Sequence, residues 1–254
     1  MADKRKVALV TGASGGIGTA IALRLAREGV FVIATSRDVA RCRALCDEIE
    51  AAGGASVALA LDVGKADSIR SLAARLGDCG AEGPVSWLVN NAGVALSAPL
   101  LAPESEALST HHMQVNFHGP RRLIEVLAPE MVAAGYGRIV NIASSAGLRG
   151  YAYVAAYCAS KHALVGYSRA AALELGPKGV FVNLVAPHYV DTPMTAEAIT
   201  RLMEKTGRSE EQARRFFEEQ NPGGRLVTVY EVADAVWELC AGEDNGCVVS
   251  LDGS

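Results

Sequence analysis

The hydrophobic residues of this chain fall in short, β-branched runs that are separated by longer stretches with helical spacing. Seven runs are predicted strands, at residues 6–10, 30–35, 56–61, 86–90, 137–144, 180–186 and 247–252. They are continuously apolar instead of alternating with polar residues, which is typical of strands covered by helices on both faces of a parallel sheet. The repeated strand–helix order predicts one doubly wound α/β domain over residues 1–254, with a seven-stranded sheet of the Rossmann type.

The stretches between these runs predict the helices that cover the sheet. They lie near 16–28, 38–52, 65–77, 104–134, 152–175 and 229–241. Pro120 is expected to kink or divide the long 104–134 region, because proline has no amide donor and its ring clashes with the preceding turn. The charged segment at 192–226 is long for a connection in such a fold, and we expect it to form a helical flap over a substrate.

Composition and charge narrow the class of protein. The chain has 254 residues, half of them hydrophobic, which suits one α/β sheet with a core on both faces. Its net charge of −4 is not that of a protein that grips nucleic acid or anionic lipid over a broad face. The sequence contains no apolar run of the roughly 18–20 residues that span a bilayer and no signal-peptide core. We therefore expect a cytoplasmic protein with neither a nucleic acid nor a membrane as partner.

The cysteines and histidines do not suggest a metal site. The six cysteines contain no C-x-x-C pair, and none of them is spaced from a histidine as zinc ligands are. Cys42 and Cys46 lie four residues apart on a predicted helix, either as a redox pair or as two small packing residues. We favour packing, because thiols stay reduced in the cytoplasm.

A glycine-rich turn follows the first predicted strand. It comprises the eight residues from Thr11 to Gly18, TGASGGIG. Gly12 permits a tight turn, Gly16 lets the backbone approach a phosphate, and Gly18 lets the next helix pack on the strand. Its position in a βαβ unit favours dinucleotide binding over a purely structural turn. The residues of the turn expected to bind the cofactor are Gly12, Ser14, Gly15, Gly16, Ile17 and Gly18.

The end of the second strand favours NADP(H) over NAD(H). NAD-binding versions of this unit end that strand with an acidic residue, which repels a 2′-phosphate. Here the strand ends in Ser36 and Arg37, a hydroxyl and a guanidinium suited to a phosphate. Asp38 is expected to cap the next helix. The alternative is that Arg37 is an ordinary surface arginine.

Tyr157 and Lys161 are the candidate acid–base pair. Four residues apart on a predicted helix, they share one face, where the ammonium is expected to lower the pKa of the phenol. An unperturbed tyrosine pKa near 10 is too high for efficient proton transfer at neutral pH. Ser144 ends a predicted strand, where doubly wound sheets gather their ligand-binding loops, so its hydroxyl is placed to hold a carbonyl oxygen.

Together these motifs resemble the short-chain dehydrogenase/reductase family, in its branch of about 250 residues. TGASGGIG looks like the TGxxxGxG of the family, and NNAG at 90–93 is similar to its structural motif. Asn116, Ser144, Tyr157 and Lys161 fall where the family carries its catalytic tetrad. The match runs from about residue 5 to 253. It implies an oxidoreductase that interconverts a ketone and a secondary alcohol by hydride transfer with NAD(P)(H).

The resemblance also implies a role for each residue of the tetrad. Tyr157 would protonate the carbonyl oxygen, or act as base in the reverse direction, while Lys161 lowers its pKa and bonds the nicotinamide ribose. Ser144 would orient the substrate oxygen, and Asn116 would hold a water that links Lys161 to solvent. The cofactor contacts that it implies, besides Tyr157, Lys161 and the residues above, are Asp62, Val63, Asn90, Ala92, Gly93, Pro187, Val190 and Thr192.

Two departures from the family pattern bear on specificity. His188 follows Pro187 where the family usually has glycine, so a side chain stands near the active-site mouth, either tolerated there or in contact with substrate. Gly15 stands where many NADP-preferring relatives have Arg or Lys, which weakens the case for NADP(H) without reversing it.

The expected substrate site is moderately apolar and partly aromatic. Its candidate residues are Leu96, Leu148, Tyr151, His188, Tyr189 and Leu202. Ile199, Leu202 and Met203 share a helix face that lines either a pocket or the core of the flap itself. The basic residues Arg149, Arg201, Lys205 and Arg208 either meet a phosphate-bearing acyl carrier or form a solvated mixed-charge face, and we favour the face.

The nearest resemblance within the family is to 3-oxoacyl-thioester reductases and polyketide-type ketoreductases. A CoA thioester is therefore the favoured substrate. The alternatives are a broad carbonyl reductase or alcohol dehydrogenase acting on free cyclic or aromatic ketones, and a catalytically silent dinucleotide sensor. The family also implies a homotetramer that packs the 104–134 and 152–175 helices against symmetry mates.

Overall fold

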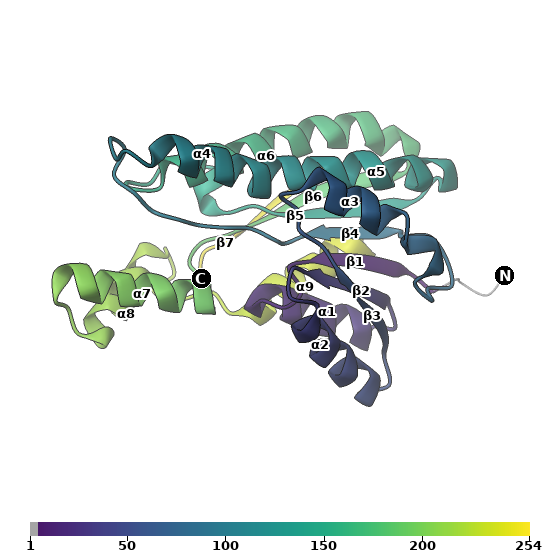
Figure 1. Ribbon diagram of the computed structural model, residues 1–254, viewed down its shortest axis with the longest axis horizontal. Helices are drawn as coiled ribbons and strands as arrows, with labels where there is room; N and C mark the ends of the chain where they lie inside the picture. Colours follow the sequence, from purple (N-terminus) through teal and green to yellow (C-terminus); the bar gives the residue numbers. More distant parts are fainter. Residues whose placement is uncertain (1–4) are drawn as a thin grey trace.

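The seven predicted strands form one sheet in the computed structural model, which describes residues 5–254 (Figure 1). Residues 1–4 of the predicted domain lie outside the described residues. All strand pairs are parallel, and the order across the sheet is β3-β2-β1-β4-β5-β6-β7. This is the doubly wound, Rossmann-like architecture that the sequence predicted. The strand bounds are β1 Val7–Thr11, β2 Phe31–Ser36, β3 Ala55–Ala60, β4 Trp87–Asn90, β5 Gly137–Ile142, β6 Val180–Pro187 and β7 Val248–Leu251.

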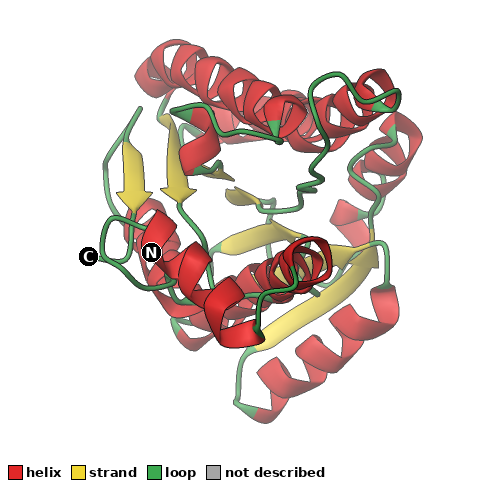
Figure 2. Cartoon of the chain, turned by 90° about the vertical axis from the view of Figure 1, so that its left-hand side faces the viewer, coloured by secondary structure: helices red, strands yellow, loops and turns green. Residues whose placement is uncertain are grey.

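Helices cover both faces of the sheet (Figures 1 and 2). One face carries α1 Gly16–Arg27, α2 Val39–Ala51 and α9 Val229–Ala241, whose apolar sides pack with the strands in one core. Cys42 and Cys46 lie buried in this core as free thiols. The second core lies under α3 Ala66–Ala73, α5 Gly119–Ala134 and α6 Ala155–Leu175. No helix in residues 5–254 is long and apolar enough to cross a membrane.

Pro120 divides the long helical region, as predicted. Helix α4, Ser105–Met113, continues into a π-helical turn at Gln114–His118, and α5 then begins at Gly119 with Pro120 in its first turn. A proline fits there, because the first amides of a helix have no partner within the helix. The π turn carries Asn116 into the interior, below the loop that follows β4.

Helix α6 begins three residues later than the sequence predicted, at Ala155 instead of residue 152. Tyr153 adopts a left-handed backbone with φ 66°, which a helix does not accommodate. Its carbonyl accepts a hydrogen bond from the amide of Ala98 at 2.9 Å. The strained residue therefore ties the loop before α6 to the loop after β4, and both loops border the site described below.

The predicted flap is a pair of helices, α7 Pro193–Thr206 and α8 Glu210–Gln220. Ile199, Ala213, Phe217 and Leu226 bury one another between the two helices and the returning chain. The two ends of the flap meet where Val190 pairs with Val227 in an isolated parallel bridge. The flap is therefore an ordered unit with a small core of its own, joined to the sheet at one neck.

Asn221 fastens this neck. Its side chain is buried, accepts a hydrogen bond from the amide of Tyr189 at 3.0 Å, and donates to the carbonyls of Tyr189 and Arg225 at 2.9 and 2.7 Å. One amide thus satisfies backbone groups on both strands of the neck.

We predict that Asn221→Ala lowers the free energy of unfolding by about 2–4 kcal/mol, because it leaves buried backbone groups without partners. Urea denaturation followed by circular dichroism measures the change. Glu219→Ala, on the exposed side of α8, is the control and should change the stability by less than about 0.5 kcal/mol. Equal stabilities of the two variants would show that the amide of Asn221 does not hold the neck.

Candidate active site

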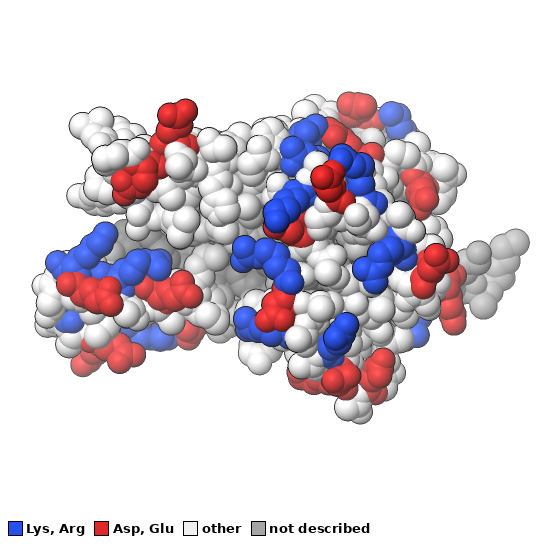
Figure 3. Space-filling model, in the orientation of Figure 1, with Lys and Arg blue, Asp and Glu red and all other residues white. Residues whose placement is uncertain are grey.

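One large cavity opens at the carboxyl ends of the strands, between the sheet and the flap. Its volume is about 1360 Å³. The strand order reverses between β1 and β4, and in doubly wound sheets the loops diverge at such a point and leave a ligand-binding crevice. The cavity runs from the glycine-rich turn and the end of β2, past Tyr157, to α7 and α8. The space-filling view shows the hollow between the flap and the body of the protein (Figure 3).

The glycine-rich turn is closed tightly against the loop after β4. Gly12 has φ +66°, and a Cβ on Gly18 would lie 2.2 Å from the carbonyl oxygen of Gly12. Asn91 donates from Nδ2 to the carbonyls of Thr11 and Gly12 at 2.9 and 3.2 Å. The hydroxyl of Thr11 accepts from the amides of Asn91 and Ala92, both at 3.0 Å. Two loops that are distant in sequence thus form one rigid wall.

The N-terminus of α1 faces the cavity at this wall. No side chain caps the helix, because its N-cap residue is Gly15, so its first amides remain available to an anion. Ser14, Gly15, Gly16 and Ile17 line the cavity beside it. A Cβ on Gly16 would lie 3.4 Å from Cδ of Pro193, so a side chain there would narrow the passage. These residues fit the pyrophosphate of a dinucleotide.

Two arginines stand at the end of the cavity next to β2. Arg37 and Arg41 both line it, and within residues 5–254 neither forms an ion pair. Asp38 caps α2, as predicted, by accepting from the amides of Ala40 and Arg41. Ser36 also lines the cavity, but its hydroxyl donates to the carbonyl of Asp38 at 2.7 Å, so its proton is not free for a phosphate. Arg41 was not singled out from the sequence, although it lies one helical turn beyond Arg37.

Asp62, Val63, Ala92 and Gly93, which the family resemblance implies as cofactor contacts, line the middle of the groove. Asn90 is not part of the lining. Its side chain is 2% exposed, and Nδ2 donates to Oδ1 of Asn141 on the neighbouring strand at 2.8 Å. The side chain is therefore held inside the sheet and not at the groove. The neighbouring Asn91 lines the groove in its place, and the sequence offered no means of telling the two asparagines apart.

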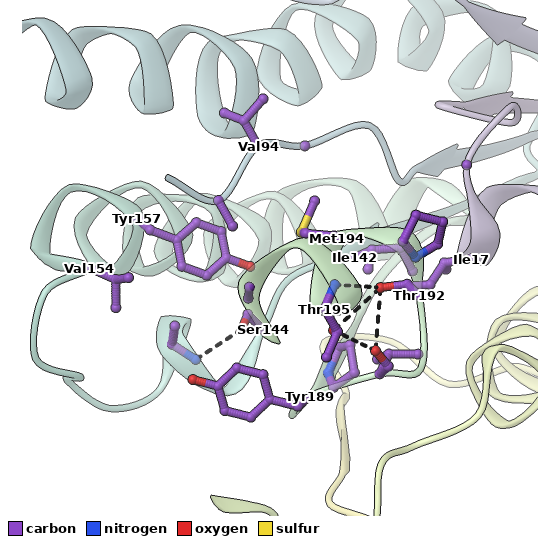
Figure 4. A pocket seen from close by; sticks show the side chains of 18 of the residues that line it. Ile17, Val94, Ile142, Ser144, Val154, Tyr157, Tyr189, Thr192, Met194 and Thr195 are labelled. Carbon is purple, nitrogen blue, oxygen red and sulfur yellow. Dashed lines mark hydrogen bonds between the residues drawn. The ribbon is translucent and has the colours of Figure 1, made fainter. Parts of the chain in front are cut away.

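Ser144, Tyr157 and Lys161 line the same cavity. Figure 4 shows the side chains of Ser144 and Tyr157 there. Ser144 follows β5 in an extended conformation and accepts a hydrogen bond from the amide of Ala146 at 3.1 Å. Tyr157 and Lys161 lie on one face of α6, with Nζ of Lys161 5.8 Å from the centre of the phenol ring. Nζ donates to the carbonyl of Ile142, at the end of β5, at 2.7 Å. Helix α6 and strand β5 together set this arrangement.

Burial is the largest influence on the pKa values of Tyr157 and Lys161. It raises the pKa of Tyr157 to about 12, and a side-chain hydrogen bond with Ser144 acts in the opposite direction. Burial also lowers the pKa of Lys161, which is 4% exposed, to about 8. The sequence analysis expected a lowered pKa for Tyr157, and the protein groups alone do not produce it. Burial raises the pKa of the phenol by more than the neighbouring groups lower it.

Asn116 lies behind the cavity wall instead of in its lining. It is fully buried, with Oδ1 accepting from the amide of Val94 and Nδ2 donating to the carbonyl of Val94, both at 2.9 Å. Nδ2 also donates to Oγ of Ser160 at 3.0 Å. A Cβ on Gly93 would lie 3.2 Å from Oδ1 of Asn116 and 3.7 Å from Nζ of Lys161, so Gly93 lies between the two side chains without room for one of its own. Its side chain is used to hold the loop after β4.

His112 is a second buried support that the sequence analysis missed. Its Nε2 accepts from the amide of Leu96 at 3.0 Å, and Nδ1 lies 2.7 Å from the carbonyl of Leu108. Its ring meets that of Tyr157 edge to face, with centroids 6.0 Å apart. Because both nitrogens are engaged in the neutral form and burial lowers its pKa, His112 is suited to packing and not to carrying a proton.

Pro187, Val190 and Thr192, further cofactor contacts implied by the resemblance, line the cavity where β6 leads into the flap. Thr192 caps α7 by accepting from the amide of Thr195 at 3.3 Å. Thr195 in turn donates to the carbonyl of Val190 at 2.6 Å. The start of the flap is thereby held beside the glycine-rich turn.

The substrate residues predicted from the sequence divide into two groups. Tyr151, His188, Tyr189 and Leu202 line the cavity, whereas Leu96 and Leu148, both about 40% exposed, point elsewhere. The three apolar residues on one face of α7 also differ in what they contact. Ile199 is buried in the core of the flap, Met203 packs against that core, and Leu202 both packs there and lines the cavity.

His188 enters the cavity at the position where the family pattern has glycine. Its amide donates to the carbonyl of Leu251 at 2.8 Å, which holds the backbone. Its ring atom Nδ1 is buried and has no protein partner. Burial, with Arg149 nearby, lowers the pKa of the ring, so His188 is neutral at physiological pH. Residues 5–254 contain no cluster of three or more His, Cys, Asp or Glu suited to a metal.

Comparison with known proteins agrees with this geometry. The profile of the family described as "short chain dehydrogenase" matches residues 6–202. The 3-oxoacyl-[acyl-carrier-protein] reductase FabG of Pseudomonas aeruginosa is 34% identical over 95% of this chain and 92% of its own. The (2S)-[(R)-hydroxy(phenyl)methyl]succinyl-CoA dehydrogenase subunit BbsD of Thauera aromatica is 34% identical over 98% and 94%. The crystal structure of actinorhodin polyketide ketoreductase with NADPH superposes with a TM-score of 0.90 at 35% identity, over 98% of this chain and 96% of that one.

The lowered pKa of Lys161 predicts a pH-dependent stability. In the folded protein the ammonium loses its proton near pH 8, whereas in the unfolded chain it stays charged to about pH 10.5. The unfolded chain therefore binds more protons in this window, and the contribution of Lys161 to stability rises with pH. From about pH 7.5 to 9.5 we expect cofactor-free wild type to gain about 1–2 kcal/mol relative to Lys161→Met.

Urea denaturation at the two pH values measures this difference. The raised pKa values of Cys42, Cys46 and Tyr189 act in the opposite direction at high pH, but equally in both proteins, because Lys161 is not among the causes of these shifts. Tyr157, with a pKa of about 12, stays protonated in the folded protein throughout this window, so the difference isolates Lys161. Lys178→Met, at an exposed lysine, should follow wild type. If the stabilities of wild type and Lys161→Met changed in parallel with pH, burial would not lower the pKa of Lys161.

Proposed function

The chain belongs to the short-chain dehydrogenase family, and we propose that it is an NADP(H)-dependent oxidoreductase that interconverts a ketone and a secondary alcohol. The observation that carries the proposal is the convergence of Ser144, Tyr157 and Lys161 on one cavity that also contains a dinucleotide-shaped groove. When bound, the nicotinamide supplies or accepts the hydride, while the side chains bind and orient the carbonyl and move the proton.

In the reducing direction Tyr157 is the acid. Its pKa of about 12 keeps the phenol protonated at neutral pH, so it can donate to the oxygen that becomes the alcohol. Ser144, which lines the cavity beside Tyr157 (Figure 4), orients that oxygen. Lys161, anchored to the carbonyl of Ile142, places a positive charge beside the phenol and stabilises the phenolate that proton donation leaves. Asn116 and His112 act as positioning residues, since their side chains hold the loop after β4.

The favoured substrate is a 3-oxoacyl thioester of the CoA type. The similarity to a 3-oxoacyl reductase and to a succinyl-CoA derivative dehydrogenase supports this class. The size of the cavity beyond Tyr157, and its lining by Tyr151, Tyr189 and Leu202, also suit an acyl chain. Free cyclic or aromatic ketones are the second candidate, favoured by the aromatic lining. A silent dinucleotide sensor remains the third reading, which retention of both Tyr157 and Lys161 disfavours.

NADP(H) is the proposed cofactor because of the charge at the adenosine end. Arg37 and Arg41 place two guanidinium groups at the cavity, while the carboxylate of Asp38 is used in capping α2. The NADPH of the similar ketoreductase agrees with this choice. The homotetramer implied by the family stays a prediction, as does a cytoplasmic location.

We predict that Tyr157→Phe lowers kcat by at least about 100-fold while NADPH still binds, because the variant loses only the proton donor. Loss of NADPH absorbance is followed with acetoacetyl-CoA, an aromatic ketone and a bulky cyclic ketone, and binding is followed by nicotinamide fluorescence. Tyr230→Phe, on the exposed side of α9, is the control. Wild type that binds NADPH but turns over none of the three ketones would favour the sensor instead.

We also predict that Arg37→Ala/Arg41→Ala raises the KM for NADPH about 10–100-fold and leaves the KM for NADH nearly unchanged, because only NADPH carries the 2′-phosphate. Steady-state kinetics with each cofactor measures the two values. Arg43→Ala is the control, since Arg43 is exposed on the same helix and does not line the cavity. Equal losses with both cofactors would contradict a phosphate site.

A further inference from the structure

One face of α7 forms an outer wall of the cavity. The residues of this helix that line the cavity recur every three or four positions, as expected for one helix face: Met194, Thr195, Ala198, Arg201, Leu202, Lys205 and Thr206. The face changes character along the helix. Met194 and Ala198 near its start are apolar, whereas Arg201 and Lys205 near its end are cationic.

The helix fixes how far these cations lie from the cofactor groove. The first turn of α7 is in contact range of the glycine-rich turn, since a Cβ on Gly16 would lie 3.4 Å from Pro193. Eleven residues separate Met194 from Lys205, which corresponds to about 16 Å along the axis. The cavity face of α7 thus forms a path from an apolar start to Arg201, about two helical turns on, and Lys205, about three turns on.

The charge of these two residues is neutralised less than that of Arg214, another basic residue of the flap. Arg214 pairs with Asp191 and Glu218 at 2.9 and 3.1 Å. Arg201 approaches Glu197 only to 3.7 Å, and Lys205 forms no ion pair within residues 5–254.

The acidic residues of α7 lie off its cavity face. Glu197 and Glu204 do not line the cavity, whereas Arg201 and Lys205 do. The space-filling view shows basic side chains along the edge of the flap that borders the hollow (Figure 3). The mixed-charge helix thus turns Arg201 and Lys205 toward the cavity, which favours the phosphate-binding alternative over the solvated face preferred from the sequence.

We propose that Arg201 and Lys205 bind the phosphate groups of a CoA thioester whose pantetheine arm lies along α7. This rests on the proposed ketone reductase and adds the site that selects the substrate class. An extended pantetheine arm separates the thioester from the phosphates by a span of this order, so a 3-oxo group at Tyr157 and phosphates at Lys205 can be held together. A small free ketone reaches only the inner, apolar end of the path and gains nothing from the cations.

Arg201→Ala/Lys205→Ala tests this site with two thioesters of the same acyl group. Acetoacetyl-CoA carries the phosphates, and the acetoacetyl thioester of N-acetylcysteamine lacks them. We expect the ratio of kcat/KM for the CoA thioester to that for the short thioester to fall roughly tenfold or more, because charge-assisted contacts to phosphate are lost. Raising the salt concentration should lower the same ratio in wild type and not in the variant.

The control is Arg208→Ala/Arg215→Ala, which removes the same charge from the flap at residues that do not line the cavity. Its ratio should stay at the wild-type value. An equal fall in both double variants would overturn the proposal in favour of a general effect of charge. An unchanged ratio in Arg201→Ala/Lys205→Ala would also overturn it, and a loss seen only with a thioester on an acyl carrier protein would assign the two cations to a protein partner instead.

A direct binding measurement separates failure of this site from failure of the proposed activity. Free CoA is titrated into the NADPH-bound protein and followed by calorimetry. Binding that is weakened in Arg201→Ala/Lys205→Ala and not in the control supports the site even if wild type reduces neither thioester. Absence of CoA binding to wild type overturns the site, whatever ketones the enzyme reduces.

Discussion

The rest of the site depends on the close approach of two loops at the point where the strand order reverses. The glycine-rich turn after β1 lies directly against the loop after β4, since a Cβ on Gly12 would lie 2.9 Å from Cα of Ala92. Because Asn91 and Thr11 hold the two loops together with four hydrogen bonds between 2.9 and 3.2 Å, the groove has a rigid floor. The free amides of α1 and the cavity face of α6 are placed relative to that floor.

A second constraint is the burial of Tyr157 and Lys161 beside each other. Removal from water raises the pKa of the Tyr157 phenol and lowers that of the Lys161 ammonium, because burial disfavours the charged form of each group. The protein alone therefore holds a protonated acid ready for a carbonyl. The removal of its proton in the reverse direction needs a positive charge that the protein side chains do not fully supply.

The flap completes the cavity with a different kind of structure. It has a small core of its own, and Asn221 together with the bridge between Val190 and Val227 joins it to the sheet. The sheet and its loops thus determine where the chemistry takes place, while the cavity face of α7 determines what lies beyond the reacting atoms.

The order of strands and helices, the glycine-rich turn, the division at Pro120 and the pairing of Tyr157 with Lys161 followed from the sequence, since each depends on local spacing, glycine conformation or a missing amide donor. Other features depend on which surfaces meet. Nothing local distinguishes Asn90, buried against Asn141, from Asn91 in the groove, or the cavity-facing Arg201 from its neighbours on α7. The pKa of Tyr157 was also decided by tertiary structure, because burial by distant segments outweighs the adjacent lysine.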